Sequence, residues 1–227
     1  MAIVTVHNIS RIYHQGKTAF KALDSVSLTI AKGEFTALAG PSGSGKTTLL
    51  NLIGGIDVAD QGTIFLDEQD LSTMKKGELA DLRLQHIGFV FQSFNLIPVL
   101  TAAENIEYIL RLQKISPSIR RQKVKAILED VGLADKANQR PSELSGGQQQ
   151  RIAVARAVVA SPAIVLADEP TANLDSVTGQ KLLNMMLHMN TDKQVTFVFA
   201  THDKMVMDYA RRVITLKDGR IANDIRK

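Results

Sequence analysis

The sequence predicts an α/β fold in which a parallel β-sheet core carries an antiparallel β layer and an inserted α-helical segment. Apolar stretches of strand length alternate with helical stretches over much of the 227 residues, which indicates a parallel sheet with helices on both faces. Short strand patterns joined by tight turns near the N-terminus indicate the antiparallel layer. A mostly helical stretch, about 92–160, interrupts the alternation and indicates the insertion.

The composition is that of a globular chain with one domain, or one large domain with a subdomain. Hydrophobic residues make up 44% of the sequence, enough for a sizeable core, and the absence of cysteine excludes disulfides and thiolate metal sites. The N-terminus has no signal-peptide pattern, and no apolar run approaches the roughly 20 residues of a membrane-spanning helix. We therefore expect a soluble chain. The net charge of +4 is most simply a solvated surface with a slight basic excess.

The N-terminal third is predicted to supply the antiparallel layer and the first buried strand. Apolar residues that alternate with polar ones mark half-buried strands, and Gly16 and Gly33 mark turns between them. The strands expected on this basis are 3–6, 23–30 and 62–66, with a turn at 10–17. Residues 35–39 are wholly apolar and predict a buried strand, which a helix at 47–53 follows.

The middle of the chain is predicted to be mostly helical. Thr101 and Glu104 form a capping box that begins one helix, and apolar residues at helical spacing mark others. The elements expected here are helix 78–85, strand 87–91, the helix after Thr101 and helix 118–132. Pro98 interrupts the apolar segment 93–100, which is predicted to be neither helix nor strand.

The C-terminal third is predicted to return to the alternation and to end in a hairpin. Its expected elements are helix 145–160, strand 163–167, helix 176–189, strand 195–200 and paired strands 213–216 and 220–222. Ligands of open parallel sheets bind at the carboxyl ends of the strands. Gly40, Gln92, Asp168 and His202 each follow an apolar strand, so we expect these four residues to converge.

The loop between the strand 35–39 and its helix matches the phosphate-binding pattern G-x-x-x-x-G-K-[ST]. Backbone N–H groups at the helix N-terminus would bind phosphate oxygens, Lys46 would reach the β- and γ-phosphates, and the Thr47 hydroxyl would ligate Mg²⁺. The bland alternative is a glycine-rich turn that only caps a helix. The nucleotide-binding candidates here are Gly40, Pro41, Ser42, Gly43, Ser44, Gly45, Lys46, Thr47 and Thr48.

Polar residues at three other strand ends are candidates for catalysis. In phosphate-loop enzymes an acid such as Asp168 holds Mg²⁺, and a neighbouring carboxylate such as Glu169 can polarise the attacking water. His202 could orient the γ-phosphate and that water, and Gln92 could reach the metal or the water. The plainer interpretations are an acid pair that faces solvent, an ordinary packed or exposed histidine, and a strand cap.

A second glycine-led helix N-terminus follows at Leu144-Ser145-Gly146-Gly147-Gln148. Paired glycines cost a helix roughly 1 kcal/mol each against alanine, so an offsetting role is expected. This N-terminus suits an anion but has no lysine equivalent to Lys46. A head-to-tail dimer would let each such loop close over phosphates held by the partner. The alternative is an ordinary N-cap followed by flexible glycines.

Together these motifs resemble those of the ATP-binding subunits of ABC transporters, over nearly the whole chain. The motifs stand in the family's order: Walker A at 40–47, Q-loop at Gln92, LSGGQ signature at 144–148, Walker B at 164–168 with Glu169, D-loop at 173–175 and H-loop at His202. The resemblance implies a P-loop NTPase core and one ATP-binding domain, 1–227. Within it, 1–91 and 161–227 would form the core, and about 92–160 the helical subdomain with the signature.

The resemblance also implies roles that the patterns alone do not assign. Tyr13 would stack on adenine, and Asp175 would connect two sites across a dimer. The γ-phosphate held by a partner copy would be contacted by Ser145, Gly146 and Gly147, with Gln148 included in the site. The implied cofactors are ATP and Mg²⁺.

Segments 87–98 and 167–176 are similar to the lipoprotein-releasing and macrolide-exporter group, which also includes antimicrobial-peptide exporters and a cell-division pair that does not transport. The resemblance implies an ATPase that dimerises around two Mg-ATP molecules and drives a separate integral-membrane permease from the cytoplasmic face of the inner membrane. The apolar segment 94–100 is a candidate docking surface for the permease. Ordinary packing within the helical subdomain explains this segment equally well.

Two other function classes stay open at this point. An ABC ATPase of a non-transport signalling complex, as in cell division, would carry the same motifs. An ABC ATPase that acts on nucleic acid is less favoured, because the chain has no long coiled coil, zinc module, second ATPase domain or basic stripe interleaved with aromatics. We therefore expect no nucleic-acid partner.

Overall fold

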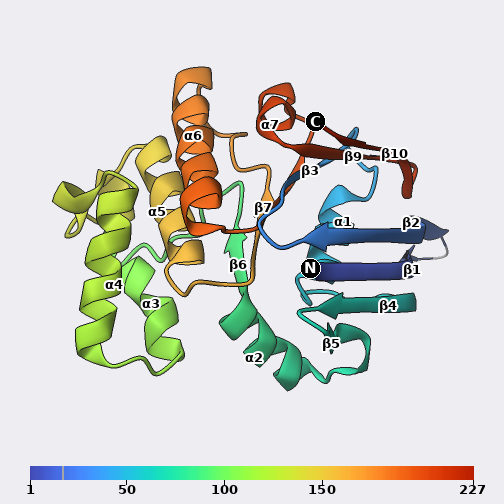
Figure 1. Ribbon diagram of the computed structural model, residues 1–227, viewed down its shortest axis with the longest axis horizontal. Coiled ribbons are helices and arrows are strands. Elements are labelled where there is room, and N and C mark those ends of the chain that lie inside the picture. The colour runs from blue at the N-terminus through green and yellow to red at the C-terminus, as the bar shows by residue number, and fades with distance from the viewer. Residues whose placement is uncertain (17) are drawn as a thin grey trace.

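The computed structural model describes residues 1–16 and 18–227, and confirms the predicted antiparallel layer beside the core (Figure 1). This layer is a four-stranded sheet in the order β2-β1-β4-β5. Its strands are β1 (Ala2–Gln15), β2 (Thr18–Ala31), β4 (Gln61–Leu66) and β5 (Gln69–Asp70). The expected turn at 10–17 is wrong as far as Gln15, because β1 stays paired with β2 up to the pair Gln15 and Thr18. Lys17 lies outside the described residues.

The core is a six-stranded sheet in the order β10-β9-β3-β8-β7-β6. Its strands are β3 (Phe35–Ala39), β6 (Ile87–Val90), β7 (Ile164–Asp168), β8 (Phe197–Thr201), β9 (Arg212–Lys217) and β10 (Arg220–Arg226). The neighbours from β9 to β6 run parallel, and β10 pairs with β9 antiparallel at the edge. The predicted terminal hairpin therefore belongs to the core sheet, where β9 lies directly beside β3.

Seven α-helices occur in the described part of the chain. They are α1 (Lys46–Ile53), α2 (Lys76–His86), α3 (Ala102–Leu112), α4 (Pro117–Asp130), α5 (Gly146–Val158), α6 (Ser176–Lys193) and α7 (Lys204–Tyr209). The capping box before α3 is confirmed, because the Glu104 N–H donates to Thr101 Oγ1 at 3.2 Å and the Thr101 N–H donates to Glu104 Oε2 at 2.8 Å. The short helix α7, capped by Asp203, was not predicted from the sequence.

Helices cover both faces of the core sheet, as the sequence predicts. One face packs α1, α2 and the antiparallel sheet, and includes Leu38 and Leu166. The other face packs α5 and α6, with Phe35, Phe197 and Phe199 at ring-centre distances of 4.7–5.8 Å. Helices α3, α4 and α5 lie together beyond β6 and β7, on the left of Figure 1. Helix α1 is thus enclosed between two sheets.

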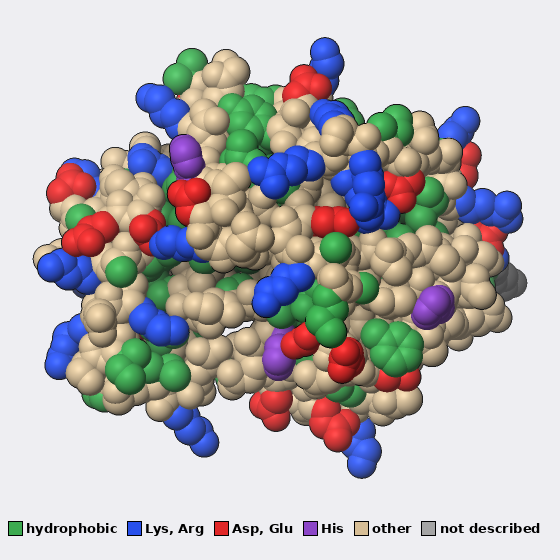
Figure 2. Space-filling view, viewed as in Figure 1, with side chains coloured by type: hydrophobic (Ala, Val, Ile, Leu, Met, Phe, Trp, Pro, Cys, Tyr) green, Lys and Arg blue, Asp and Glu red, His purple; other side chains and the backbone are tan. Residues whose placement is uncertain are grey.

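The face of the molecule shown in Figure 2 is mixed in charge. Basic and acidic side chains are interspersed over the face shown in Figure 2, on the helical part as well as on the sheets. No helix in the ranges 1–16 and 18–227 is long and apolar enough to cross a bilayer.

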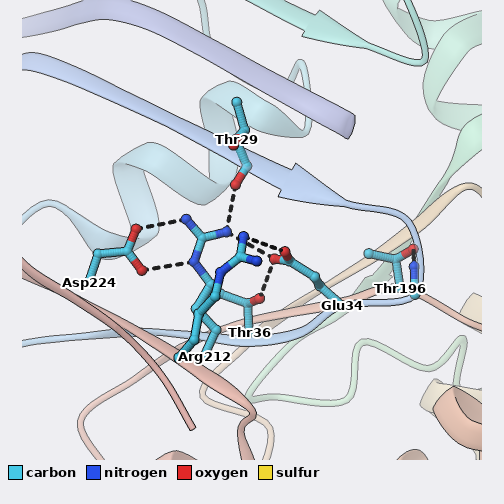
Figure 3. A network of polar contacts seen from close by, with 8 residues as sticks. Thr29, Glu34, Thr36, Thr196, Arg212 and Asp224 are labelled. Carbon is cyan, nitrogen blue, oxygen red and sulfur yellow. Dashed lines mark hydrogen bonds and ion pairs between the residues drawn. The ribbon is translucent and has the colours of Figure 1, made fainter. Parts of the chain in front are cut away.

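A buried arginine joins the two sheets (Figure 3). The Arg212 guanidinium donates to both carboxylate oxygens of Asp224 at 2.8 and 2.7 Å, to Glu34 Oε2 at 3.0 Å and to the Thr29 carbonyl of β2 at 2.7 Å. Arg212 is only 6% exposed, and its hydrogen bonds lower the pKa of the Asp224 carboxyl. The charges of this network are therefore paired, as burial requires.

Replacement of Arg212 tests this tie between the sheets. We expect Arg212→Ala to lower the free energy of unfolding by about 3 kcal/mol, because it leaves Asp224 without its guanidinium partner and Glu34 with only the exposed Arg226. Urea denaturation followed by circular dichroism measures the change. Arg220→Ala is the matched control: its guanidinium pairs with Asp24 but the side chain is 72% exposed, so the expected loss is below about 1 kcal/mol. Equal losses in both variants would contradict the assignment.

Candidate active site

A cavity of about 520 Å³ lies at the carboxyl ends of the core strands and gathers most of the predicted site residues. Those that line it are Tyr13, Pro41, Ser42, Gly43, Gly45, Lys46, Thr47, Thr48, Gln92, Asp168, Glu169 and His202. Gly40 and Ser44 belong to the same loop but do not line the cavity. A larger cavity of about 700 Å³, near Ala163 and Val195 at the opposite ends of the strands, includes none of the predicted residues. Convergent polar groups, rather than size, therefore mark the site.

The loop between β3 and α1 has a backbone that only glycine can form at two positions. Gly40 and Gly45 have φ angles of 145° and 101°, in the region that side chains disfavour. A Cβ atom on Gly40 would lie 2.3 Å from the Leu216 carbonyl oxygen, and one on Gly45 would lie 2.6 Å from the Ala22 carbonyl oxygen. The loop is thus held between β9 and β2 at the N-terminus of α1.

Lys46 places a cation in the middle of this loop. Its Nζ donates to the carbonyl oxygens of Gly40 at 2.8 Å and Pro41 at 2.9 Å, and the residue is only 7% exposed. The ammonium group therefore lies inside the loop, at the N-terminus of α1, and the N-terminus of a helix attracts anions. The arrangement suits a phosphate group that would take the place of the two carbonyl contacts.

Thr47 and Asp168 bring two oxygen ligands together across the cavity. The Thr47 hydroxyl donates to Asp168 Oδ1 at 3.2 Å. Burial raises the pKa of Asp168, as does the nearby charge of Glu169, while the Thr47 hydrogen bond and Lys46 act in the opposite direction. Among the described residues, no group of three or more His, Cys, Asp or Glu side chains could hold a metal ion. The pair fits Mg²⁺, which typically takes one or two protein oxygens and completes its shell with water and phosphate.

Glu169 and His202 form a second polar pair at the cavity. His202 Nδ1 lies 2.6 Å from Glu169 Oε1, and the Thr201 hydroxyl donates to Glu169 Oε2 at 3.1 Å. The Glu169 backbone has φ 46°, an uncommon value for a residue with a side chain. Its side chain is 17% exposed and that of His202 is 69% exposed. The carboxylate is therefore fixed in direction, and it is partly buried at the wall of the cavity.

The remaining candidates form a separate cluster that does not line this cavity. Ser145 and Gln148 make a reciprocal capping box at the start of α5, with distances of 2.8 and 3.3 Å. Asp175 caps α6 by accepting from the N–H and hydroxyl of Thr178, and these bonds lower its pKa. Gly147 lies against Thr178, so the starts of α5 and α6 adjoin. None of the residues Ser145, Gly146, Gly147, Gln148 and Asp175 lines the cavity.

Sequence reasoning missed several residues at the site. Phe20, Ala22 and Ala172 also line the cavity. Phe20 stands opposite Tyr13 in the β1–β2 pairing, a position that the expected turn at 10–17 concealed. The fully buried Gln150 donates to the carbonyl oxygens of Phe91 at 3.3 Å and Pro170 at 2.7 Å, and so links the ends of β6 and β7. A glutamine within a helix gives no sequence signal for such a contact.

The fold and the loop define a phosphate-loop nucleotide-binding protein of the α/β class. The family model described as "ABC transporter" matches residues 23–172, and the chain belongs to that family.

Known relatives agree with this assignment. The chain is 44% identical to the ABC transporter ATP-binding protein YxdL of Bacillus subtilis, over 98% of this chain and 86% of the relative. It is 40% identical to the macrolide export ATP-binding/permease protein MacB of a Shewanella strain, and covers 35% of that longer protein. Among solved structures, it resembles a dimeric post-hydrolysis state of the ATP-binding cassette MJ0796 bound to ADP and Pi, with TM-score 0.90, 41% identity and 98% coverage of both chains. MJ0796 comes from Methanocaldococcus jannaschii.

The two glycines of the signature helix are expected to respond differently to alanine. A Cβ on Gly147 would lie 2.3 Å from Thr178 Cγ2, so Gly147→Ala should lower the free energy of unfolding by about 1–3 kcal/mol. A Cβ on Gly146 would meet nothing closer than 3.6 Å, so Gly146→Ala should leave stability unchanged or raise it by up to about 1 kcal/mol. Urea denaturation of the two variants measures both effects, and equal destabilisation would show that the α5–α6 contact is not the cause.

Proposed function

We propose that this chain is the ATP-binding and ATP-hydrolysing subunit of an ABC transporter of the lipoprotein-release, macrolide-export or peptide-export type. The observation that carries the proposal is the convergence of Lys46, Thr47, Asp168 and Glu169 in one cavity at the carboxyl ends of the strands. Membership of the ABC transporter family makes ATP the nucleotide. Among the relatives, the macrolide export proteins combine an ATP-binding part with a permease, which supports a membrane permease as the partner here.

The residues of the cavity divide the work of binding and hydrolysis. Lys46 and the loop backbone would hold the β- and γ-phosphates, while Thr47, Asp168 and Gln92 would hold Mg²⁺. When bound, Mg²⁺ neutralises charge on the phosphate oxygens. Glu169 accepts a proton from the attacking water, because its carboxylate is oriented by Thr201 and lines the cavity. His202, in contact with Glu169, orients that water toward the γ-phosphate.

The separate cluster at the starts of α5 and α6 supports a head-to-tail homodimer. This cluster presents a helix N-terminus that suits an anion, yet it does not line the chain's own cavity. We infer that Ser145, Gly146 and Gly147 complete the nucleotide site of a second copy, and that Asp175 connects the two sites. The solved cassette MJ0796, 41% identical over 98% of this chain, is dimeric, which supports a dimer here. ATP binding would close this dimer, and hydrolysis would open it.

Replacement of Glu169 tests the catalytic role. Glu169→Gln keeps the shape of the side chain but removes the proton acceptor, so ATP hydrolysis should fall by about 10²–10⁴-fold while ATP binding persists. Phosphate release measures the rate, and size-exclusion chromatography with Mg-ATP should show a trapped dimer. Glu129→Gln, an exposed position on α4, is the control with unchanged turnover. Wild-type turnover of Glu169→Gln would remove Glu169 from the role of base.

The segment 94–100 combines internal packing with exposed apolar surface. Arg156 holds its start by donating to the carbonyl oxygens of Asn95 at 2.6 Å and Phe94 at 3.0 Å. Leu96 packs against the core of the helical part, whereas Val99 is 74% exposed. Ile97 lines a groove of about 420 Å³ beside α3 and β6. We propose this groove and Val99 as the permease contact, which would place the chain at the inner face of the membrane.

Val99→Asp tests the docking surface. The exposed aspartate should abolish co-purification with the permease, because it brings a charge into an apolar contact, and ATP affinity should be retained. Ile225→Asp, at a side chain that is 51% exposed on β10, is the control and should co-purify normally. Leu96→Asp is unsuitable, since its packing against the core predicts lost stability. Normal co-purification of Val99→Asp would overturn the proposed surface.

A further inference from the structure

Two aromatic side chains stand together at the side of the nucleotide cavity formed by the antiparallel sheet. Tyr13 of β1 and Phe20 of β2 are register partners, so their side chains project from the same face of the sheet. Both line the cavity with the phosphate loop, and they are 38% and 57% exposed. An exposed aromatic pair beside a phosphate site is suited to a nucleobase, because every base offers a π-face for stacking.

The ring of Tyr13 is held at two points. The guanidinium carbon of Arg11 lies 4.8 Å from the centre of the ring, within the range of a cation–π contact. The Tyr13 hydroxyl donates to Asp57 Oδ2 at 2.8 Å. Arg11 also donates to Asp57 through two nitrogens, to Oδ2 at 3.0 Å and to Oδ1 at 2.8 Å. The three side chains therefore form a closed triangle, in which the guanidinium and carboxylate fix the tyrosine.

This triangle is attached to the helix that begins at the phosphate loop. Asp57 lies four residues after the end of α1, and its N–H donates to the Asn51 carbonyl of that helix at 3.3 Å. Asp60 fixes the strand side, accepting from the Ile12 N–H at 2.6 Å and from Arg11 at 3.1 Å. Helix α1 thus begins with Lys46 at the phosphate loop. The segment that follows its other end contains Asp57, which fixes the position of the Tyr13 ring.

The family resemblance already implies that Tyr13 stacks on the base of the bound nucleotide. We propose that Arg11 and Asp57 are positioning residues that hold the Tyr13 ring, with Phe20 beside it, in the orientation that this stacking requires. The inference rests on the proposed ATP site. Because the guanidinium covers one face of the ring, the base stacks on the other face. Stacking on Tyr13 raises the affinity for a nucleotide but does not distinguish one base from another, since all bases can stack.

The test compares a nucleotide with a ligand that has phosphates but no base. Isothermal titration measures Kd for ATP and for inorganic tripolyphosphate, each with Mg²⁺. We expect Asp57→Ala to raise Kd for ATP about tenfold and to leave Kd for tripolyphosphate unchanged. In a Tyr13→Ala background, Asp57→Ala should have no further effect on ATP, as a double-mutant cycle requires of residues that act through one another.

Conservative variants separate positioning from folding. Asp57→Asn keeps an acceptor for the Tyr13 hydroxyl and should restore part of the ATP affinity. Tyr13→Phe removes only the hydroxyl and should raise Kd about threefold. In steady-state hydrolysis, Asp57→Ala should raise KM while kcat at saturating ATP stays within about twofold. Asp81→Ala, an exposed carboxylate on α2, is the matched control.

The outcomes distinguish this inference from the proposed function. If Asp57→Ala weakens ATP and tripolyphosphate equally, or if neither Asp57→Ala nor Tyr13→Phe changes Kd for ATP, the positioning role is overturned while the nucleotide site stands. If the wild-type chain binds neither ligand, or if Lys46→Ala binds both as well as wild type, the proposed function itself fails. If Asp57→Ala weakens the binding of ATP and leaves the binding of tripolyphosphate unchanged, the result supports the positioning role.

Discussion

The rest of the site depends on the close approach of the β3–α1 loop to two backbone carbonyls. Gly40 lies against Leu216 of β9, and Gly45 lies against Ala22 of β2, at separations that a Cβ atom would reduce below van der Waals contact. The loop therefore touches the core sheet and the antiparallel sheet at once. Because this contact fixes where α1 begins, it also fixes the directions of Lys46 and Thr47.

Strand order carries this constraint across the molecule. The parallel neighbours β3, β8, β7 and β6 end at the same edge, so the residues that follow them meet there: the loop, His202, Asp168 with Glu169, and Gln92. The sequence predicts this much because each polar group directly follows a wholly or mostly apolar strand. The α/β class, the antiparallel layer and the helices of the core were accessible for the same reason: their signals are local and periodic.

Features that rest on contacts between distant residues could not be predicted. The β1–β2 hairpin continues past Ser10 although that stretch is polar, because Asp57 and Asp60 bind Arg11 and Ile12 from 44 or more residues away. Because the sequence does not predict this part of the hairpin, it also does not predict that Phe20 lies opposite Tyr13. Helix α7 has only six residues, which are too few to show an amphipathic pattern in the sequence. Its start becomes evident only in the structure, where the Asp203 side chain caps it. The Arg212 network joins β2, β9 and β10, which no short pattern connects.

The two glycines at the start of α5, Gly146 and Gly147, differ in their surroundings in the fold. Two glycines in one helix start call for an offsetting contact. For Gly147 the fold supplies it, since Thr178 occupies the space where a side chain would be. Gly146 has no such reason within the described part of the chain: its nearest neighbour, Phe94, would lie at an ordinary 3.6 Å. No contact among the described residues offsets the helix-destabilising effect of Gly146, so we look for the offsetting contact in another molecule. Gly146 stands beside the Ser145 cap and does not line the chain's own cavity, so it is where the proposed dimer should bring a partner's phosphates closest to the backbone.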